Sequence, residues 1–265
     1  MPDSRCERIA QSMIEPVGSR KGKAMEAVAK GKEEAKAAVV DALQIKRPRD
    51  VRFWIAMAVM VLGAAAFAVI AYSVWETAPI LKQDLQVSVW LHTHGNPAFS
   101  AFLLAITQVH STIGIPILSV IVAYYLWRHG DRYWVLSLAL AVAGGLLLNV
   151  VLKLIFNRDR PTWDDPLLTL TSSSFPSGHT AGATLFYGFL AVYMVWRMKH
   201  SLPRALALLG CALMVALVGF SRIYLGVHFL SDVLAAASIS TVWLVICLVS
   251  VRAYAKRRSG SATAA

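Results

Sequence analysis

Long stretches without Asp, Glu, Lys or Arg constrain this chain more than any other feature. A helix that crosses a membrane needs about 20 apolar residues, because lipid leaves no partner for an unpaired backbone group. Five stretches fit, and they are Phe53–Trp75, Tyr133–Leu152, Thr180–Trp196, Ala205–Ser221 and Val233–Val251. The chain is 57% hydrophobic and 15% charged, whereas soluble proteins average about 25% charged residues. The sequence therefore predicts an all-α integral membrane protein.

A sixth stretch, Pro97–Trp127, is too long for one ordinary span. His110 and Pro116 interrupt it, and proline breaks or kinks a helix. We therefore predict a short helix over 98–109 and a span over 111–128. The predicted organisation is a six-helix transmembrane bundle with flanking segments: a polar extension over 1–50, the membrane domain over 51–255, and a flexible cytoplasmic tail over 256–265.

Lys and Arg residues predict how these spans are oriented. The first 52 residues hold 12 of the 26 Lys and Arg residues, and cytoplasmic loops carry an excess of both. Six alternating spans place the two termini and the loops near 128–132 and 197–204 on this cytoplasmic side. The loops near 77–97, 157–178 and 222–228 then face outward. The same rule explains the net charge of +11, so we do not predict nucleic-acid binding.

The polar parts of the chain support three further expectations. Residues 17–46 are rich in Ala, Lys and Glu and predict an exposed cytoplasmic helix. The basic run Lys46–Arg49 is interpreted as a topology anchor, with contact to anionic lipid headgroups as the alternative. The segment Gln83–His92 fits an interfacial helix or an extended strand-like piece equally well. No short basic region followed by an apolar core begins the chain, so no cleavable signal peptide is expected.

Cationic side chains gather at the outward ends of the predicted spans. Lys153 ends the third span, Arg160 follows in the next loop, and Arg222 ends the fifth span. Ionisable residues at membrane depth are costly, which makes them functional candidates. Three cations on one side repel one another unless an anion binds, and Arg and Lys are the usual phosphate ligands. These residues therefore predict a phosphate site.

The segment Pro176-Ser177-Gly178-His179 lies where the fourth predicted span begins. Free N–H groups and the helix dipole favour an anion at a helix start. Gly178 also permits close approach of the backbone. We therefore predict that Ser177 and Gly178 contact the same phosphate.

His228 and Asp232 are four residues apart, which on a helix places them on one face, one turn apart. The carboxylate holds one imidazole nitrogen protonated and leaves the other as a nucleophile or base. His179 comes from a different helix start and approaches a bound phosphate from another side. In-line displacement needs this arrangement, in which one group attacks and another protonates the leaving oxygen.

The remaining ionisable residues receive ordinary interpretations. Asp164 and Asp165 resemble a metal pair, but no other ligands lie nearby in the sequence, so we predict loop solvation and no metal site. Five histidines lack comparable neighbours and are interpreted as loop or interface residues: His92, His94, His110, His129 and His200.

Together these residues resemble the three-part motif of the type 2 phosphatidic acid phosphatase and vanadium haloperoxidase superfamily. All three parts are complete and in the family's order, and they read Lys153-x6-Arg160-Pro161, Pro176-Ser177-Gly178-His179 and Ser221-Arg222-x5-His228-x3-Asp232. The resemblance covers about 98–255 and does not extend to 1–50. It implies a helical bundle, often with six spans in the membrane members, and hydrolysis without a metal or other cofactor. Haloperoxidases of this superfamily are soluble and bind vanadate, so six spans favour the membrane branch.

The resemblance also implies roles for individual residues. His228 would be the nucleophile, and Asp232 would orient it. His179 would protonate the leaving group and then help to activate the water that cleaves a phosphohistidine. The residues implied as phosphate ligands are Lys153, Arg160, Ser177, Gly178 and Arg222.

The expected function is metal-independent hydrolysis of a membrane lipid phosphate or diphosphate. Undecaprenyl diphosphate is the leading substrate, followed by phosphatidic acid, phosphatidylglycerophosphate and the lipid A phosphate. The expected location is the bacterial cytoplasmic membrane, with the site on its outer face. One alternative is a lipid phosphotransferase with the same site. Another is a lipid-phosphate transporter or scaffold, although binding alone would not need a polarised histidine.

Overall fold

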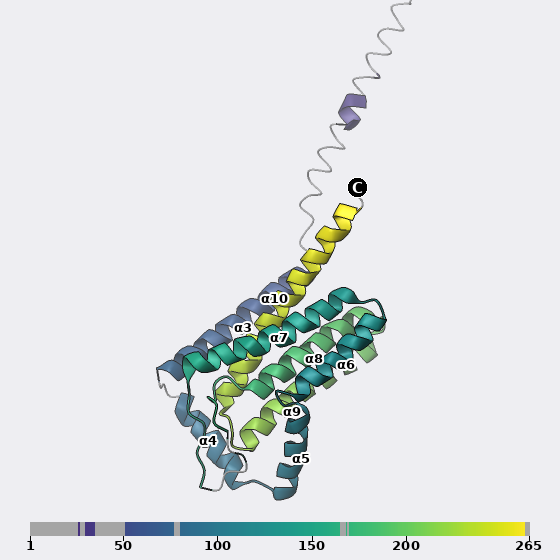
Figure 1. Cartoon of the computed structure of the whole chain (residues 1–265). Coiled ribbons are helices and arrows are strands. Elements are labelled where there is room, and N and C mark those ends of the chain that lie inside the picture. The colour runs from purple at the N-terminus through teal and green to yellow at the C-terminus, as the bar shows by residue number, and fades with distance from the viewer. Residues whose placement is uncertain are drawn as a thin grey trace, which may run out of the picture. The chain divides into compact units, whose positions relative to one another are not determined.

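The computed structural model describes residues 26, 30–34, 51–76, 80–164, 168 and 170–262. Within these ranges the chain forms helices and no strands (Figure 1), as predicted. The major helices are α3 (Val51–Trp75), α4 (Ile80–Thr93), α5 (Pro97–Val109), α6 (Gly114–Arg128), α7 (Arg132–Phe156), α8 (Gly178–Arg197), α9 (Ser201–Tyr224) and α10 (Leu230–Ala262). Contacts divide the chain into two units, Met1–Ile55 and Ala56–Ala265.

The polar flanking segments are described only in part. Of the predicted extension over 1–50, residues 26 and 30–34 are helical and exposed, and the Lys46–Arg49 run lies outside the described residues. At the other end, α10 continues as a helix through Ala262. The predicted tail over 256–265 is therefore helical over its first seven residues, and its last three lie outside the described part.

Four described helices are long and apolar enough to cross a membrane: α3 over Phe53–Trp75, α7, α9, and α10 over Leu230–Arg258. The pair α5 and α6 forms a fifth span if taken together, with a bend of 51° between them. This is the break predicted near His110. Gly114 permits it, because a Cβ there would lie only 2.0 Å from the Val109 carbonyl oxygen.

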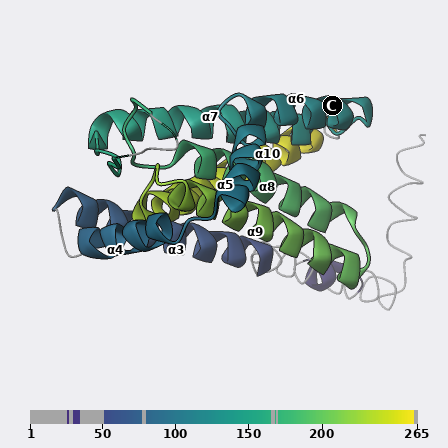
Figure 2. The ribbon, with the colours of Figure 1, turned by 90° about the horizontal axis from the view of Figure 1, so that it is seen from below.

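The fourth predicted span, Thr180–Trp196, corresponds to α8, which is not among the helices apolar enough to be counted as a span in the described part. Its composition follows from its central position, since it contacts α6, α7, α9 and α10 (Figures 1 and 2). A helix enclosed by protein does not need an apolar surface all round. Small and hydroxyl-bearing residues therefore replace larger apolar ones, including Thr180, Gly182 and Thr184. The hydrophobic core around α8 includes Ile115, Leu138, Leu185, Phe189 and Leu244.

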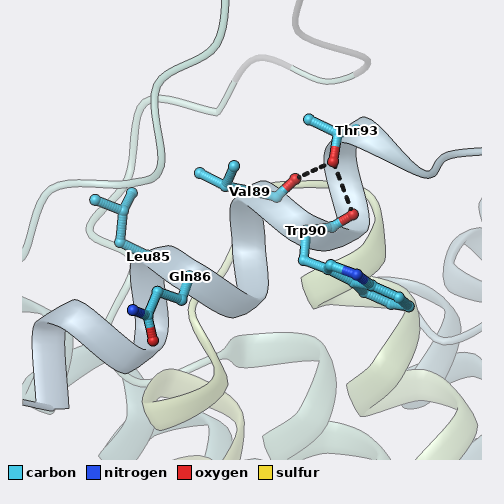
Figure 3. A pocket seen from close by; sticks show the side chains of 5 residues that line it. All are labelled: Leu85, Gln86, Val89, Trp90 and Thr93. Atoms are coloured by element: carbon cyan, nitrogen blue, oxygen red, sulfur yellow. Dashed lines mark hydrogen bonds between the residues drawn. The ribbon is translucent and has the colours of Figure 1, made fainter.

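Helix α4 resolves the ambiguous segment Gln83–His92 as helical. One side of α4 is buried through Asp84, Ser88 and Leu91, where it contacts α9 and α10. The other side carries exposed apolar residues. Figure 3 shows an open pocket on this exposed side, lined by Leu85, Gln86, Val89, Trp90 and Thr93. Helix α4 thus has one face in the bundle and one apolar face outside it.

Candidate active site

The structure brings the eight predicted site residues to one end of the bundle, where α7 and α9 end and α8 and α10 begin. Backbone hydrogen bonds connect three of these termini. Ser177 N donates to the Asp232 carbonyl oxygen at 3.1 Å, which connects the start of α8 to the start of α10. The Arg222 carbonyl oxygen accepts bonds from the N–H groups of Val227 and His228, both at 3.2 Å, which folds the α9–α10 connection back on itself. These bonds tie the start of α8, the end of α9 and the start of α10 together at the site.

His228 and Asp232 form the predicted pair. His228 Nδ1 lies 3.3 Å from Asp232 Oδ2, and the Phe229 N–H donates to the same oxygen at 2.9 Å. The two side chains are 2% and 0% exposed. Because a carboxylate only accepts hydrogen bonds, Nδ1 carries the hydrogen and Nε2 is left with a free electron pair.

The expectation that both residues lie on one helix is wrong, because α10 begins at Leu230 and His228 precedes it. Gly226 makes this possible through a backbone φ of +69°, which turns the chain back before the helix starts. Trp163 supports the turn by donating its Nε1 hydrogen to the Gly226 carbonyl oxygen at 2.9 Å.

Arg160 reaches this histidine from the loop after α7. Its Nη1 lies 2.7 Å from the Val227 carbonyl oxygen and 3.3 Å from His228 Nε2. Its Nε donates to the Ser172 carbonyl oxygen at 2.7 Å, which fixes the plane of the guanidinium. His228 Nε2, the predicted nucleophilic atom, therefore faces a cation. A phosphate bound to that cation would lie in front of this nitrogen.

Lys153 and Gly178 lie beside each other at the α7–α8 junction. Lys153 Nζ donates to the Ser173 carbonyl oxygen. A Cβ on Gly178 would lie 3.4 Å from Asn149 Oδ1 and 4.0 Å from Lys153 Cε. Ser177 is the N-cap of α8, but its side chain makes no capping bond. The first N–H groups of a helix have no partner within the helix, so the start of α8 can receive an anion.

Arg222 is 1% exposed and is the largest fully buried side chain in the described part. Its Nη1 donates to Thr107 Oγ1 of α5 at 2.7 Å, whereas its Nε has no partner. A buried charged group with an unsatisfied donor is costly. At this end of the bundle, beside Arg160 and Lys153, an acceptor supplied by a bound anion would satisfy the free donor of Arg222.

Burial and positive neighbours keep both histidines neutral in this site. Burial, followed by the charges of Arg222, His228, Arg160 and Lys153, lowers the pKa of His179 to about 3. His179 lies just before the predicted span, which begins at Thr180. Burial also lowers the pKa of His228 to about 4, although its hydrogen bond to Asp232 opposes the change. A bound phosphate would raise both pKa values, since a negative charge favours the imidazolium form.

Two ionisable residues that were not predicted as site residues form a network with the pair: Arg158 bonds to Asp232, and Asp84 bonds to Arg158. Arg158 Nη1 donates to Asp232 Oδ1 at 2.6 Å, and Arg158 Nη2 donates to Asp84 Oδ2 at 3.0 Å. The sequence signals were an extra arginine in the outward loop and a single carboxylate in the Gln83–His92 segment. Neither signal reveals the contact, because Asp84 lies on α4, 74 residues before Arg158 in the chain.

The histidines interpreted as ordinary residues lie in other surroundings. His110 is buried and bonds to Tyr187 Oη at 2.7 Å, and His92 stacks on Trp163 with ring centroids 4.1 Å apart. Asp164 is described, whereas Asp165 lies outside the described residues. Among the described residues there is no group of three or more His, Cys, Asp or Glu side chains arranged to hold a metal.

Comparison with known sequences gives a family match and several relatives. The PAP2 superfamily matches residues 134–256, a range that includes all eight predicted site residues. The chain is 32% identical over 144 residues to phosphatidylglycerophosphatase B of Bacillus subtilis (strain 168), which covers 54% of this chain and 70% of that protein. It is 28% identical over 162 residues to undecaprenyl-diphosphatase BcrC of the same organism, which covers 57% of this chain and 74% of that protein.

Two solved structures resemble the fold. A transmembrane PAP2-type phosphatidylglycerolphosphate phosphatase from Bacillus subtilis superposes with a TM-score of 0.66 and 27% identity, covering 75% of this chain and 96% of that chain. LpxE of Aquifex aeolicus superposes with a TM-score of 0.50 and 27% identity, covering 63% of this chain and 94% of that chain.

Proposed function

Because this chain belongs to the PAP2 superfamily, we propose that it hydrolyses a membrane lipid phosphate or diphosphate through a phosphohistidine on His228, without a metal ion. Its relatives are named phosphatases, and the chain is itself a lipid phosphate hydrolase with membrane-spanning helices. Beyond this class of enzyme, we infer the covalent intermediate, the substrate and the side of the membrane on which the site opens.

One observation carries the mechanism: the two nitrogens of His228 face opposite kinds of group. Nδ1 faces the Asp232 carboxylate at 3.3 Å, and Nε2 faces Arg160 Nη1 at 3.3 Å. The carboxylate holds the proton on Nδ1, which leaves the pair of electrons on Nε2 directed toward a cation. A phosphate bound to that cation would present its phosphorus to Nε2.

In the first step His228 Nε2 forms a bond to phosphorus while the bond between phosphorus and the leaving oxygen breaks. Protonated His179 gives its proton to that oxygen. Arg160, Arg222, Lys153 and the N–H groups at the start of α8 stabilise the charge on the other phosphate oxygens. Asp232 stabilises the positive charge that develops on the histidine ring.

In the second step a water molecule attacks phosphorus and the bond between phosphorus and Nε2 breaks. Neutral His179 takes a proton from the water, which returns it to the form needed for the next cycle. Inorganic phosphate leaves, and His228 regains its free electron pair. Apart from the water molecule, both steps use only protein groups at this end of the bundle.

A lipid substrate is supported by the two faces of α4. Asp84 on its inner face accepts a hydrogen bond from the Ser231 N–H at 2.9 Å, next to Asp232. Leu85, Val89 and Trp90 are exposed on its outer side (Figure 3). The hydrocarbon chain of a substrate lying on this side would leave its headgroup near the site. Undecaprenyl diphosphate and phosphatidylglycerophosphate are the first two candidates.

The position of the site supports an outward-facing orientation. The catalytic end contains the last residues of α7 and α9, whereas Arg128, Arg132, Arg197 and Arg204 lie at helix termini of the opposite end. Since cytoplasmic ends carry the excess of Lys and Arg, we infer that the site opens on the periplasmic or extracellular side.

The proposal is tested with the full chain purified in detergent. We expect release of inorganic phosphate in the presence of EDTA from one member of a panel: undecaprenyl diphosphate, phosphatidic acid, phosphatidylglycerophosphate or lipid A. His228→Ala should abolish release and leave the melting temperature within a few degrees of wild type. Arg204→Met, at the opposite end of the bundle, serves as the matched control. Full activity of His228→Ala, or a strict requirement for magnesium, would refute the mechanism.

A further inference from the structure

A buried ionic network extends the site from α10 to α4. Arg158 Nη1 donates to Asp232 Oδ1 at 2.6 Å and to Ser231 Oγ at 2.7 Å, and its Nη2 donates to Asp84 Oδ2 at 3.0 Å. The Arg158 side chain is only 9% exposed, and that of Asp84 is 2% exposed. One guanidinium is thus shared between two buried carboxylates.

The same network holds Arg158 and the start of α10 in place. The Arg158 N–H donates to Ser173 Oγ at 3.0 Å, and its guanidinium carbon lies 4.4 Å from the centroid of the Phe229 ring. Asp84 accepts hydrogen bonds from both the N–H and the hydroxyl of Ser231. A carboxylate at a helix N-terminus is stabilised by the free N–H groups and the dipole. Asp84 therefore anchors the residue directly before Asp232.

The two oxygens of Asp232 have different partners because of this arrangement. Oδ1 accepts from Arg158, whereas Oδ2 accepts from the Phe229 N–H and faces His228 Nδ1. With Oδ1 held by Arg158, rotation of the carboxylate away from His228 would break a charge-assisted bond. Such bonds are about twice as strong as neutral ones.

Resting on the proposed function, we propose that Asp84 and Arg158 are a positioning pair for the His228–Asp232 couple. Arg158 orients the Asp232 carboxylate toward His228. Asp84 takes up part of the positive charge of Arg158, so that Asp232 keeps enough negative charge to stabilise the imidazolium formed when His228 attacks. Neither residue needs to touch the substrate.

The charges around the site agree with this division of roles. In the described part of this end of the bundle, the cations Lys153, Arg160 and Arg222 have no carboxylate within ion-pair distance, whereas Arg158 has two. The first three are available to a phosphate, and Arg158 is already neutralised by protein groups. Arg158 therefore differs from the phosphate ligands, although it lies two residues before one of them.

The Asp84→Asn substitution removes the negative charge of this side chain and keeps its size and shape. Asn keeps an acceptor for the Ser231 N–H and a donor for the Ser231 hydroxyl, so the fold should be retained. The unbalanced charge of Arg158 would then act fully on Asp232. We expect kcat to fall by about 10–100-fold, by analogy with the loss seen when residues that orient metal ligands are replaced, with KM changing less than about threefold. Asp131→Asn, which removes a carboxylate partner of Tyr193 at the other end of α7, is the matched control.

The pH profile distinguishes positioning through charge from a purely structural role. The charged and titratable groups facing His228 are Asp232, Arg160, Arg222 and His179. All of them stay unchanged in the variants. Asp84→Asn removes a negative charge and should move the acid limb of kcat/KM to lower pH. Arg158→Gln removes a positive charge and should move it to higher pH, each by roughly half a unit or more.

Two further variants complete the experiment. Arg158→Lys keeps the charge but loses the fork that reaches both carboxylates, so kcat should fall with little movement of the acid limb. In the Asp84→Asn/Arg158→Gln double variant the acid limb should return toward its wild-type position, and the loss in kcat should be smaller than the product of the two single losses.

The outcomes separate this inference from the proposed function. If wild type releases no phosphate from any lipid of the panel, the proposed function fails. If wild type is active and both single variants keep wild-type kcat, the positioning role is refuted. The same holds if both acid limbs move in the same direction. A rise in KM at unchanged kcat in Arg158→Gln would instead make Arg158 a phosphate ligand and would also overturn the inference.

Discussion

Replacing Arg222 by Met should remove activity without destabilising the empty protein. Arg222 is 1% exposed, and a guanidinium carries five N–H donors. Its Nη1 bonds to Thr107 Oγ1 at 2.7 Å, and its Nε has no partner. Replacing an incompletely paired buried ion by an apolar side chain of similar length is often neutral or stabilising by about 1–4 kcal/mol. We therefore expect a melting temperature equal to or above that of wild type in phosphate-free buffer.

The loss of activity follows from the bonds that a phosphate would make. Hydrogen bonds to charged groups contribute about 1.5–3 kcal/mol each, and about 1.4 kcal/mol corresponds to a factor of ten. If two donors of Arg222 bind the phosphate, kcat/KM should fall by roughly 10²- to 10⁴-fold. Vanadate, a phosphate mimic, should raise the melting temperature of wild type but not of Arg222→Met.

The assays are phosphate release and thermal unfolding in the same detergent, with Arg204→Met as control. Arg204 also has a buried Nε without a partner, and its Nη2 donates to the Met198 carbonyl oxygen at 2.6 Å. It lies near the start of α9, whereas Arg222 lies near the end. Arg204→Met should keep wild-type activity. An Arg222→Met protein that melts several degrees lower and still hydrolyses substrate would show that Arg222 is structural and would refute the reasoning.

Three further predictions concern the residues around the nucleophile. Asp232→Asn should lower kcat by about 10³- to 10⁴-fold, because the amide does not stabilise the imidazolium; a loss below tenfold in the phosphate-release assay would contradict the proposed role. His228 has a folded-state pKa of about 4, below its ordinary value of 6.5, so the unfolded chain binds more protons between these values. Stability should therefore fall as pH drops from 6.5 through 4, and the melting temperature should fall less in His228→Ala over the same range. Gly226→Ala places a Cβ 2.5 Å from Trp163 Nε1 at a φ of +69°. We expect at least a tenfold loss of kcat as the turn shifts, whereas Gly210→Ala, which meets no atom within 4 Å, should be unaffected.

The apolar stretches predicted most of the fold because burial in lipid acts on each helix separately. The break near His110 was also predictable, since His110 and Pro116 are local signals. The number of spans was not predictable in the same way. Helix α8 lies among four neighbours, so the tertiary contacts rather than the lipid determine its composition.

The proposed phosphate site could be inferred from the sequence because its members are chemically unusual where they occur. Lys153, Arg160 and Arg222 are cations at the ends of apolar stretches, and His228 lies four residues from Asp232. Short spacings such as these preserve the relation between two side chains even when the local structure differs. The helix predicted to hold both residues does not include His228, yet the pair still forms across the start of α10.

The sequence by itself determined the membrane class and the family and supplied the candidate residues for a phosphate site, because each depends on local composition or short spacing. The tertiary structure decided how these residues meet. It placed Arg160 against the free nitrogen of His228 and left Arg222 with an unsatisfied donor. It also brought Asp84 from α4 to Arg158, a contact between residues 74 positions apart. A contact of that kind depends on how helices pack, and no local pattern along the chain encodes it.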